Sequence, residues 1–386
     1  MEQKIYNEYV EILKEELLPA MGCTEPIAVA YAAAVAVQAL GEKPESVEVN
    51  VSANIIKNVK SVVVPCTGGL RGIGAAVCAG IVAGCPEKEL EILEEITGEQ
   101  KVEMKKMLDT MPMTIRESDK EYIFDIQIKA CAGGHSGYVE IAGFHTNVIC
   151  VKKDDEIIRE KAYEEQGSSC ATDRSLLTVE KIIEFADCVD VADVEEVLQR
   201  QIDYNWAIAE EGMTGNWGAA IGKTLMEAYG NSVHNRAKAM AAAGSDARMN
   251  GCELPVVINS GSGNQGMTTS LPVIVYAKEL NVSKEMMLRA LVVSNLITIH
   301  MKTGIGRLSA YCGAISAGCG AGAGICYLYG GRAYEISHVI VNAVAINSGV
   351  VCDGAKASCA AKIASAVEAG LLGLQMQKNG KQFYGG

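Results

Sequence analysis

The 386-residue chain has few aromatic side chains, which make up 5% of it, whereas it contains 40 glycines and many alanines. It also lacks any cluster of lysine and arginine, and its formal net charge is −13. An acidic chain repels phosphate backbones, so we expect no nucleic acid among its partners. Small side chains let backbones approach closely. The composition therefore favours tightly packed helices around a site over an aromatic-rich binding surface.

No signal-peptide pattern opens the sequence. The first residues, MEQKIYNEYVEILKEELL, follow an amphipathic helical pattern with acidic side chains instead of a basic stub before an apolar run. We therefore expect a cytoplasmic protein. Thiols stay reduced in that compartment, so some of the 14 cysteines are expected to serve metal binding or catalysis rather than disulfides.

A long uncharged segment, residues 310–329, raises the question of a membrane span. Twenty residues are enough to cross a bilayer. However, the segment is mostly Ala, Gly, Ser and Cys, whose transfer into lipid gains little free energy. We therefore expect a buried helix here and no membrane association.

The hydrophobic pattern divides the chain into a strand-rich part and a helix-rich part. Residues 46–64 alternate apolar and polar side chains, which predicts a strand or a hairpin. Further strands are predicted at 113–117, 121–131, 136–142 and 145–152. Helices are predicted at 3–18, 24–40, 72–85, within 86–108, and at 178–187, 193–211, 216–229, 232–250, 268–280, 283–301, 308–329, 334–345 and 355–376. We expect an α+β fold with a mainly helical body of small-residue-rich helices (residues 1–44 and 166–386) and a small antiparallel β-sheet lobe (residues 45–165).

A Gly/Ser-rich segment, Asn259-Ser260-Gly261-Ser262-Gly263-Asn264-Gln265-Gly266, directly precedes a predicted helix. Such a helix start exposes backbone N–H groups at the positive end of the helix dipole, which suits an anion. The segment lacks the lysine of a Walker loop and the spacing of a dinucleotide fingerprint. Ser260, Ser262, Asn264 and Gln265 are therefore candidate residues for binding an amino-acid substrate. A tight turn without a ligand is the alternative.

Three cysteines near the C-terminus, Cys312, Cys352 and Cys359, are candidate metal ligands. Cys352 and Cys359 lie seven residues apart, so a helix beginning between them could direct both thiols to one side. Three thiolates are too few for a structural zinc site, but they suit a cubane cluster with one iron left open. The spacing fits no ferredoxin pattern, so buried packing cysteines are the alternative. Cys319 and Cys326 continue the spacing of Cys312 along one helix and are predicted to be packing residues.

Two further residues could take part in catalysis. Cys23 stands at the start of a helix that opens Gly22-Cys23-Thr24-Glu25-Pro26, where the helix dipole is expected to lower the pKa of the thiol. It is a candidate base or nucleophile, against a structural cysteine. His135 lies in a glycine-flanked turn between strands, where it could bind substrate or be a surface histidine. The sequence has no Ser/His/Asp order, no HExxH and no lysine context typical of pyridoxal phosphate.

Taken together, four segments resemble the L-cysteine desulfidase family, which is related to the alpha chain of bacterial iron–sulfur L-serine dehydratases. The resemblance covers residues 5 to 375, and its wider dehydratase part lies mainly in the half with the three cysteines. The segments are Met21-Gly22-Cys23-Thr24-Glu25-Pro26, Ser260–Gly266, Gly304-Ile305-Gly306-Arg307-Leu308-Ser309 with Cys312, and Cys352-Asp353-Gly354-Ala355-Lys356 with Cys359.

The resemblance implies a 4Fe–4S cluster held by Cys312, Cys352 and Cys359, with the fourth iron open to substrate. It implies that L-cysteine and water give pyruvate, ammonia and hydrogen sulfide, with Cys23 near the substrate as the base. His135 could orient the substrate or transfer a proton. A soft iron site prefers sulfur, which favours cysteine over serine. An iron–sulfur L-serine dehydratase and a non-enzymatic metal or sulfur-relay protein are the alternatives, and the apolar Ala/Gly helices are compatible with a homodimer.

Overall fold

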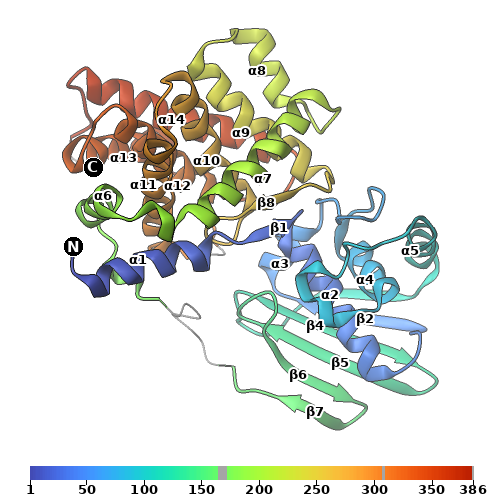
Figure 1. Ribbon diagram of the computed structural model, residues 1–386. Helices are drawn as coiled ribbons and strands as arrows, with labels where there is room; N and C mark the ends of the chain where they lie inside the picture. Colours follow the sequence, from blue (N-terminus) through green and yellow to red (C-terminus); the bar gives the residue numbers. More distant parts are fainter. Residues whose placement is uncertain (164–171, 307–308, 385–386) are drawn as a thin grey trace.

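The computed structural model describes residues 1–163, 172–306 and 309–384, which form a helical body and a smaller lobe with a β-sheet (Figure 1). Arg307 and Leu308, which belong to one of the motifs above, lie outside the described residues. The helical body contains α1 (Gln3–Glu16), β1 (Pro19–Met21), η2 (Arg174–Leu176), α6 (Val179–Cys188), η3 (Val191–Asp193), α7 (Glu195–Thr214), α8 (Ile221–Tyr229), α9 (Val233–Met249), β8 (Pro255–Val257), α10 (Gly263–Glu279), α11 (Lys284–Thr303), α12 (Gly313–Leu328), α13 (Ala333–Asn347) and α14 (Cys359–Lys378).

The lobe is built on a six-stranded sheet whose strands follow the order β3-β2-β4-β5-β6-β7. Neighbouring strands are antiparallel, except that β2 and β3 run parallel. Helix α2 packs on the sheet in one apolar core, and the α+β fold with a mainly helical body is confirmed (Figure 1). The lobe contains α2 (Thr24–Leu40), β2 (Ser46–Val51), α3 (Ala53–Val59), α4 (Gly72–Ala83), η1 (Pro86–Glu91), α5 (Gly98–Thr110), β3 (Met113–Glu117), β4 (Asp125–Ala132), β5 (His135–Ala142), β6 (Val148–Lys153) and β7 (Glu156–Glu160).

Small residues allow very close helix contacts in both parts. A Cβ atom added at Gly80 of α4 would stand 1.9 Å from the carbonyl oxygen of Ala30 on α2. A Cβ atom at Gly318 of α12 would stand 2.3 Å from the carbonyl oxygen of Ala366 on α14. Only glycine permits these contacts, so the expectation of closely packed small-residue helices is confirmed.

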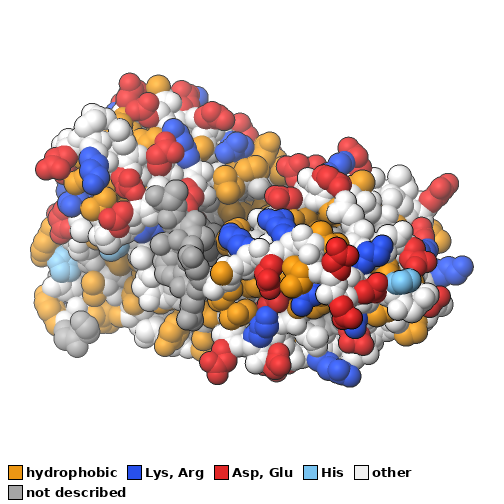
Figure 2. Space-filling view, turned by 90° about the horizontal axis from the view of Figure 1, so that it is seen from below, with side chains coloured by type: hydrophobic (Ala, Val, Ile, Leu, Met, Phe, Trp, Pro, Cys, Tyr) orange, Lys and Arg blue, Asp and Glu red, His pale blue; other side chains and the backbone are white. Residues whose placement is uncertain are grey.

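The uncharged segment at 310–329 forms α12, which is buried among other helices of the body. Within the described residues, no helix combines the length and the apolar character that crossing a membrane requires. On the face seen in Figure 2, basic and acidic side chains are interspersed. That no nucleic acid binds stays a prediction, and the mixed charges differ from the one-sided basic surface typical of nucleic-acid binding.

Several elements differ from the sequence-based predictions, since β1, β7 and β8 were not predicted and β2 runs parallel to β3. The predicted strand or hairpin at 46–64 is wrong beyond residue 51, because β2 ends there and α3 begins at Ala53. Helix α2 packs with the sheet, whereas the predicted boundary at residue 44 assigned it to the helical body. Because α2 is apolar nearly all round, its sequence indicates burial without indicating the partner.

A short strand pair in the body, next to the lobe, brings the starts of two helices together. β1 pairs with β8, with Pro19 opposite Val257 and Met21 opposite Pro255. Helix α2 begins shortly after β1, and α10 begins shortly after β8. The three-residue pairing therefore keeps the N-termini of both helices at the junction between body and lobe.

Candidate active site

A cavity of about 160 Å³ lies at this junction and receives side chains from both parts of the molecule. It contains all of the sequence-predicted site residues except His135. Its polar and charged lining residues include Cys23, Glu25, Lys57, Asn58, His145, Arg248, Ser260, Ser262, Asn264, Gln265, Lys302, Cys312, Cys352, Cys359 and Lys362.

A backbone bridge holds Cys312 and Cys352 side by side. Tyr311 and Val351 pair as an isolated antiparallel bridge. The N–H of Cys312 donates to the carbonyl of Val350 at 3.1 Å, and the N–H of Cys352 donates to the carbonyl of Ala310 at 2.7 Å. Two cysteines that are 40 positions apart in the chain therefore enter the cavity from neighbouring backbone segments.

Cys359 reaches the same cavity from the first residue of α14. The turn before it depends on Gly354, whose φ is +102° and where a Cβ atom would stand 2.1 Å from the carbonyl oxygen of Lys57. Asp353 forms ion pairs with Lys356 and Lys362, which tie this turn to α14. The segment from Cys352 to Cys359 is thus fixed at both ends.

The thiols of Cys312, Cys352 and Cys359 are near one another in the cavity, but they do not form a site for a single metal ion. Burial is the main cause that raises the pKa of the Cys312 and Cys359 thiols, and each is raised further by the nearby Cys352. Within the described residues, no group of three or more His, Cys, Asp or Glu side chains could hold one metal ion. In an iron–sulfur cluster each thiolate binds a different iron, so the ligands stand farther apart. Cys312, Cys352 and Cys359 are thus three thiols that line one cavity, and their role as cluster ligands stays a prediction.

Cys23 lies at the N-cap of α2, as predicted, but its expected ionisation is wrong. Burial, and then the charge of Glu25, raise the pKa of the Cys23 thiol well above its ordinary value, although Arg248 opposes this. The thiol donates a hydrogen bond to Oε2 of Glu25 at 3.1 Å. Desolvation and the adjacent carboxylate therefore outweigh the helix dipole.

Glu25 is a half-buried carboxylate of the same motif, for which the sequence predicted no role. Burial alone would raise its pKa, yet the charge of His145 and the hydrogen bond from Cys23 bring it below its ordinary value. Nδ2 of Asn58 donates to Oε1 of Glu25 at 3.0 Å. Glu25 is therefore an ionised carboxylate that accepts hydrogen bonds from both Cys23 and Asn58.

The histidine at the cavity is His145 and not His135. His135 opens β5 at the edge of the lobe, has 61% of its side chain exposed, and pairs with Asp154 at 2.9 Å. His145 lies in the loop before β6, where its ring packs edge-on against Phe124 with centroids 4.9 Å apart. The structure does not bring His135 to the other candidate residues, because the strand β5 carries it away from the junction.

The loop before α10 places its Ser and Asn side chains at the cavity. Ser260 and Gly261 have φ values of +51° and +79°. Asn259 and Ser262 then exchange both of their backbone hydrogen bonds, at 3.2 and 3.1 Å. This tight turn leads directly into the first turn of α10, and anion or substrate binding by its N–H groups stays a prediction.

Two buried cations line the cavity that the sequence reading did not select. Arg248 lies in the last turn of α9, and Lys302 lies in the last turn of α11. Burial lowers the pKa of Lys302 to about 8, although the thiols of Cys352 and Cys312 oppose the shift. The signal that could have revealed both residues is a single cation within a run of small or apolar residues, since such cations are rarely buried without a role.

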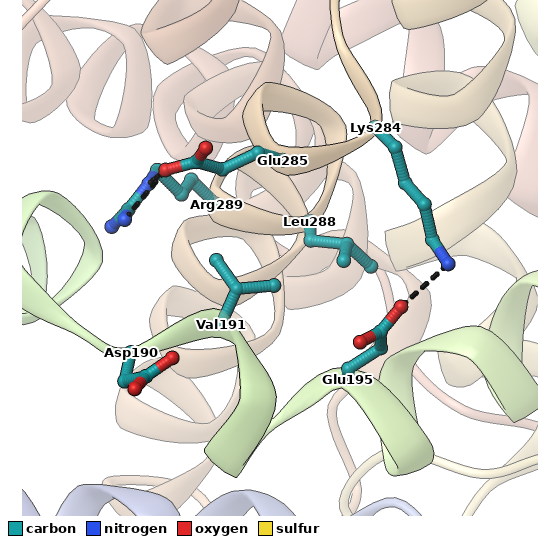
Figure 3. Close-up of a pocket in the computed structure, with 7 residues that line it drawn as sticks. All are labelled: Asp190, Val191, Glu195, Lys284, Glu285, Leu288 and Arg289. Atoms are coloured by element: carbon teal, nitrogen blue, oxygen red, sulfur yellow. Dashed lines mark hydrogen bonds and ion pairs between the residues drawn. The ribbon is translucent and has the colours of Figure 1, made fainter.

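A second hollow, of about 360 Å³, lies at the surface between η3 and the start of α11 (Figure 3). Its charged side chains pair with one another, since Lys284 contacts Glu195 at 2.6 Å and Arg289 contacts Glu285 at 2.8 Å. It is lined by no cysteine or histidine. The junction cavity is therefore the better candidate for chemistry.

The fold and this cavity define an α+β protein with a thiol-lined site between two lobes. Residues 87–385 match the family model described as serine dehydratase alpha chain. A UPF0597 protein of Desulfitobacterium hafniense (strain Y51) is 58% identical over 385 residues, which cover 100% of this chain and 90% of that protein. UPF0597 proteins of Lachnoclostridium phytofermentans and Treponema denticola are 50% and 43% identical, covering 99% and 100% of this chain and 91% of each relative.

The chain belongs to the iron–sulfur serine dehydratase alpha chain family. The resemblance expected from the sequence motifs is thereby confirmed. The family is one of lyase-type dehydratases that depend on an iron–sulfur group, so membership supports a dehydratase-like protein with an iron–sulfur cofactor.

Proposed function

We propose that this protein is an L-cysteine desulfidase, a carbon–sulfur lyase that converts L-cysteine and water into pyruvate, ammonia and hydrogen sulfide. The observation that carries the proposal is the convergence of Cys312, Cys352 and Cys359 on one cavity that also holds Cys23 and the start of α10. Membership of a lyase family supports it. The choice of cysteine over serine rests on the preference of soft metal sites for sulfur.

Cys312, Cys352 and Cys359 would hold a 4Fe–4S cluster. When bound, such a cluster supplies a Lewis acid at the iron without a protein thiolate, which makes the β-substituent of the substrate a better leaving group. Ser260, Ser262, Asn264 and Gln265 would bind the substrate together with the first N–H groups of α10, which suit its carboxylate.

Cys23 remains the first choice for the group that removes the proton from Cα, in partnership with Glu25. The Cys23 thiol must first give up its own proton, and the hydrogen bond to Oε2 of Glu25 provides the path. Loss of sulfide from the substrate then gives aminoacrylate, which becomes pyruvate and ammonia by tautomerisation and hydrolysis without the enzyme.

An L-serine dehydratase is the second candidate, because the matching family model is described by that activity. The same residues would act, with hydroxide as the leaving group in place of sulfide. A non-enzymatic metal or sulfur-relay protein would need no anion-binding helix start, such as that of α10, beside the thiols. A cytoplasmic location and a homodimer stay predictions.

The test is pyruvate release by anaerobically purified protein supplied with L-cysteine or L-serine. We expect pyruvate and sulfide in equal amounts from L-cysteine, at a higher rate than pyruvate from L-serine. Faster turnover of L-serine would establish the second candidate. Protein that contains iron and sulfide but forms pyruvate from neither amino acid would refute both.

A further inference from the structure

The junction cavity has an excess of positively charged side chains. Lys57, Arg248, Lys302 and Lys362 line it, whereas Glu25 is the one carboxylate among its described lining residues. The whole chain carries a net charge of −13, so this positive character is local. A concave surface lined by cations raises the local concentration of anions, which indicates an anionic group on the ligand.

Arg248 is the cation whose surroundings define this anion most closely. Its residue is 4% exposed. Nη2 donates to the carbonyl oxygen of Gly22 at 2.7 Å, and Nη1 donates to Oδ1 of Asn264 at 3.3 Å. Both acceptors are neutral and Nε has no hydrogen-bond partner. Within the part of the chain that the structure describes, no carboxylate lies within ion-pair distance of the guanidinium, although its charge helps to lower the pKa of Glu25 in the same cavity. Because a buried charge is costly unless it is paired, Arg248 is prepared for a negatively charged ligand.

The position of Arg248 beside the start of α10 strengthens this inference. A Cβ atom at Gly263 would stand 2.4 Å from Nε of Arg248, so the missing side chain of Gly263 lets the guanidinium lie against the first turn. A cation is unfavourable at the positive end of a helix dipole. A bound anion would interact favourably with both the guanidinium and the first turn, and would remove the conflict between them.

Gln265 supplies a hydrogen-bond acceptor to the same cavity, whereas Arg248 supplies donors. Its residue is 6% exposed, and Oε1 is buried without a hydrogen-bond partner among the described residues. The side chain lies against Gly313, where a Cβ atom would stand 2.6 Å from Cδ of Gln265. Since buried acceptors normally receive a hydrogen bond, a donor on the ligand is indicated here.

We propose that Arg248 and Gln265 recognise the two charged ends of a zwitterionic α-amino acid. Arg248 binds the α-carboxylate together with the first turn of α10, and Oε1 of Gln265 accepts a hydrogen bond from the α-ammonium group. The assignment rests on the proposed function, which supplies an amino acid as the ligand. It adds the residues that distinguish an amino acid from other thiols.

Two partial analogues of L-cysteine separate the two contacts. 3-Mercaptopropionate keeps the thiol and the carboxylate but has no amine, whereas cysteamine keeps the thiol and the amine but has no carboxylate. Binding of each to the anaerobic holoenzyme is measured by calorimetry, with Arg248→Gln and Gln265→Leu as the variants. Arg236→Gln is the matched control, because Arg236 lies on α9 as well but pairs with Glu279 outside the cavity.

The expected result is a crossover. Arg248→Gln should weaken binding of 3-mercaptopropionate by about 10-fold to 100-fold, as for the loss of a charged hydrogen bond, and leave cysteamine within about twofold. Gln265→Leu should weaken cysteamine and spare 3-mercaptopropionate. Arg236→Gln should change neither. Arg248→Lys keeps the charge without the planar fork, and should weaken only 3-mercaptopropionate.

Equal loss of both analogues in either variant would overturn the assignment, since it would indicate a structural role. Unchanged binding in both variants, or a reversed crossover, would overturn it as well. Calorimetry does not depend on turnover, so a crossover without pyruvate release would refute the proposed function alone. Pyruvate release without a crossover would refute only the roles of Arg248 and Gln265.

Discussion

Replacing Cys312 by alanine should abolish cluster binding, whereas the same replacement at Cys319 or Cys326 should not. All three cysteines lie on or directly before α12, at intervals of seven residues. Only Cys312 lines the junction cavity. The three variants therefore make the same chemical change along one helix, at increasing distance from the proposed cluster.

The expected magnitudes follow from the helix geometry. At a rise of about 1.5 Å per residue, Cys319 lies about 10 Å and Cys326 about 21 Å along the axis from Cys312. Both are almost fully buried, at 1% and 2% exposure. Their replacement should therefore lower the free energy of unfolding by about 1 kcal/mol through the small cavity it creates, while cluster content stays unchanged. Loss of Cys312 leaves two of three ligands, so iron should fall from about four to below about one atom per chain.

The assay is iron and acid-labile sulfide content after anaerobic reconstitution, together with the brown absorbance near about 400 nm of thiolate-bound clusters. Circular dichroism establishes that each variant is folded. A Cys312→Ala protein that keeps the iron and the colour would refute the ligand assignment. Loss of iron from folded Cys319→Ala protein would show that the ligand set was wrongly chosen. Cys352→Ala and Cys359→Ala should behave like Cys312→Ala.

Three further predictions concern other parts of the structure. Gly266→Ala should lower the free energy of unfolding by about 1–3 kcal/mol in urea titrations, since its Cβ would stand 2.0 Å from a backbone oxygen of β8, whereas Gly98→Ala, with nothing within 4 Å, should not destabilise the protein. Glu25→Gln should keep the iron but slow pyruvate release at least about 100-fold, and an unchanged rate would exclude Glu25 from proton transfer. The hydrogen bond from His234 chiefly lowers the pKa of Glu368 to about 2, below its ordinary 4.5, so its stabilisation is complete above pH 4.5 and lost as the pH falls towards 2. The melting-temperature difference between wild type and Glu368→Gln should therefore shrink over that range, and a constant difference would contradict the linkage.

The helical body was predictable because its signals are local. Apolar periodicity and small residues determined most helices of the second half, and α10 begins at the Gly/Ser segment that exposes its N–H groups. The segment after residue 51 was mispredicted, because Ile55 and Val59 lie four residues apart and so fit one face of a strand as well as one face of the short helix α3. Strand β2 stops at Val51, where its pairing with β4 and β3 also stops. The local sequence pattern does not show where these partner strands end.

The site residues that belong to sequence motifs were predictable, whereas those that depend on contacts between distant segments were not. Cys312, Cys352 and Cys359 came from the family resemblance, and the structure places them in one cavity. The ionisation of Cys23 was misjudged, because the helix start is visible in the sequence while burial and the adjacent Glu25 carboxylate are not. His145 was missed for a similar reason, since only the arrangement of the strands decides which histidine reaches the junction.

Helix α2 connects the core of the lobe rigidly to the cavity. Its 17 residues span about 25 Å, its body is embedded in the core of the lobe, and its first turn carries Glu25 into the cavity. A rotation of the lobe by only about 5° about the far end of α2 would move Glu25 by about 2 Å at that length. Such a displacement would move Glu25 away from the cavity residues that the body supplies, among them Arg248 and Cys312. The angle between body and lobe therefore determines whether the Glu25 carboxylate is correctly placed in the cavity.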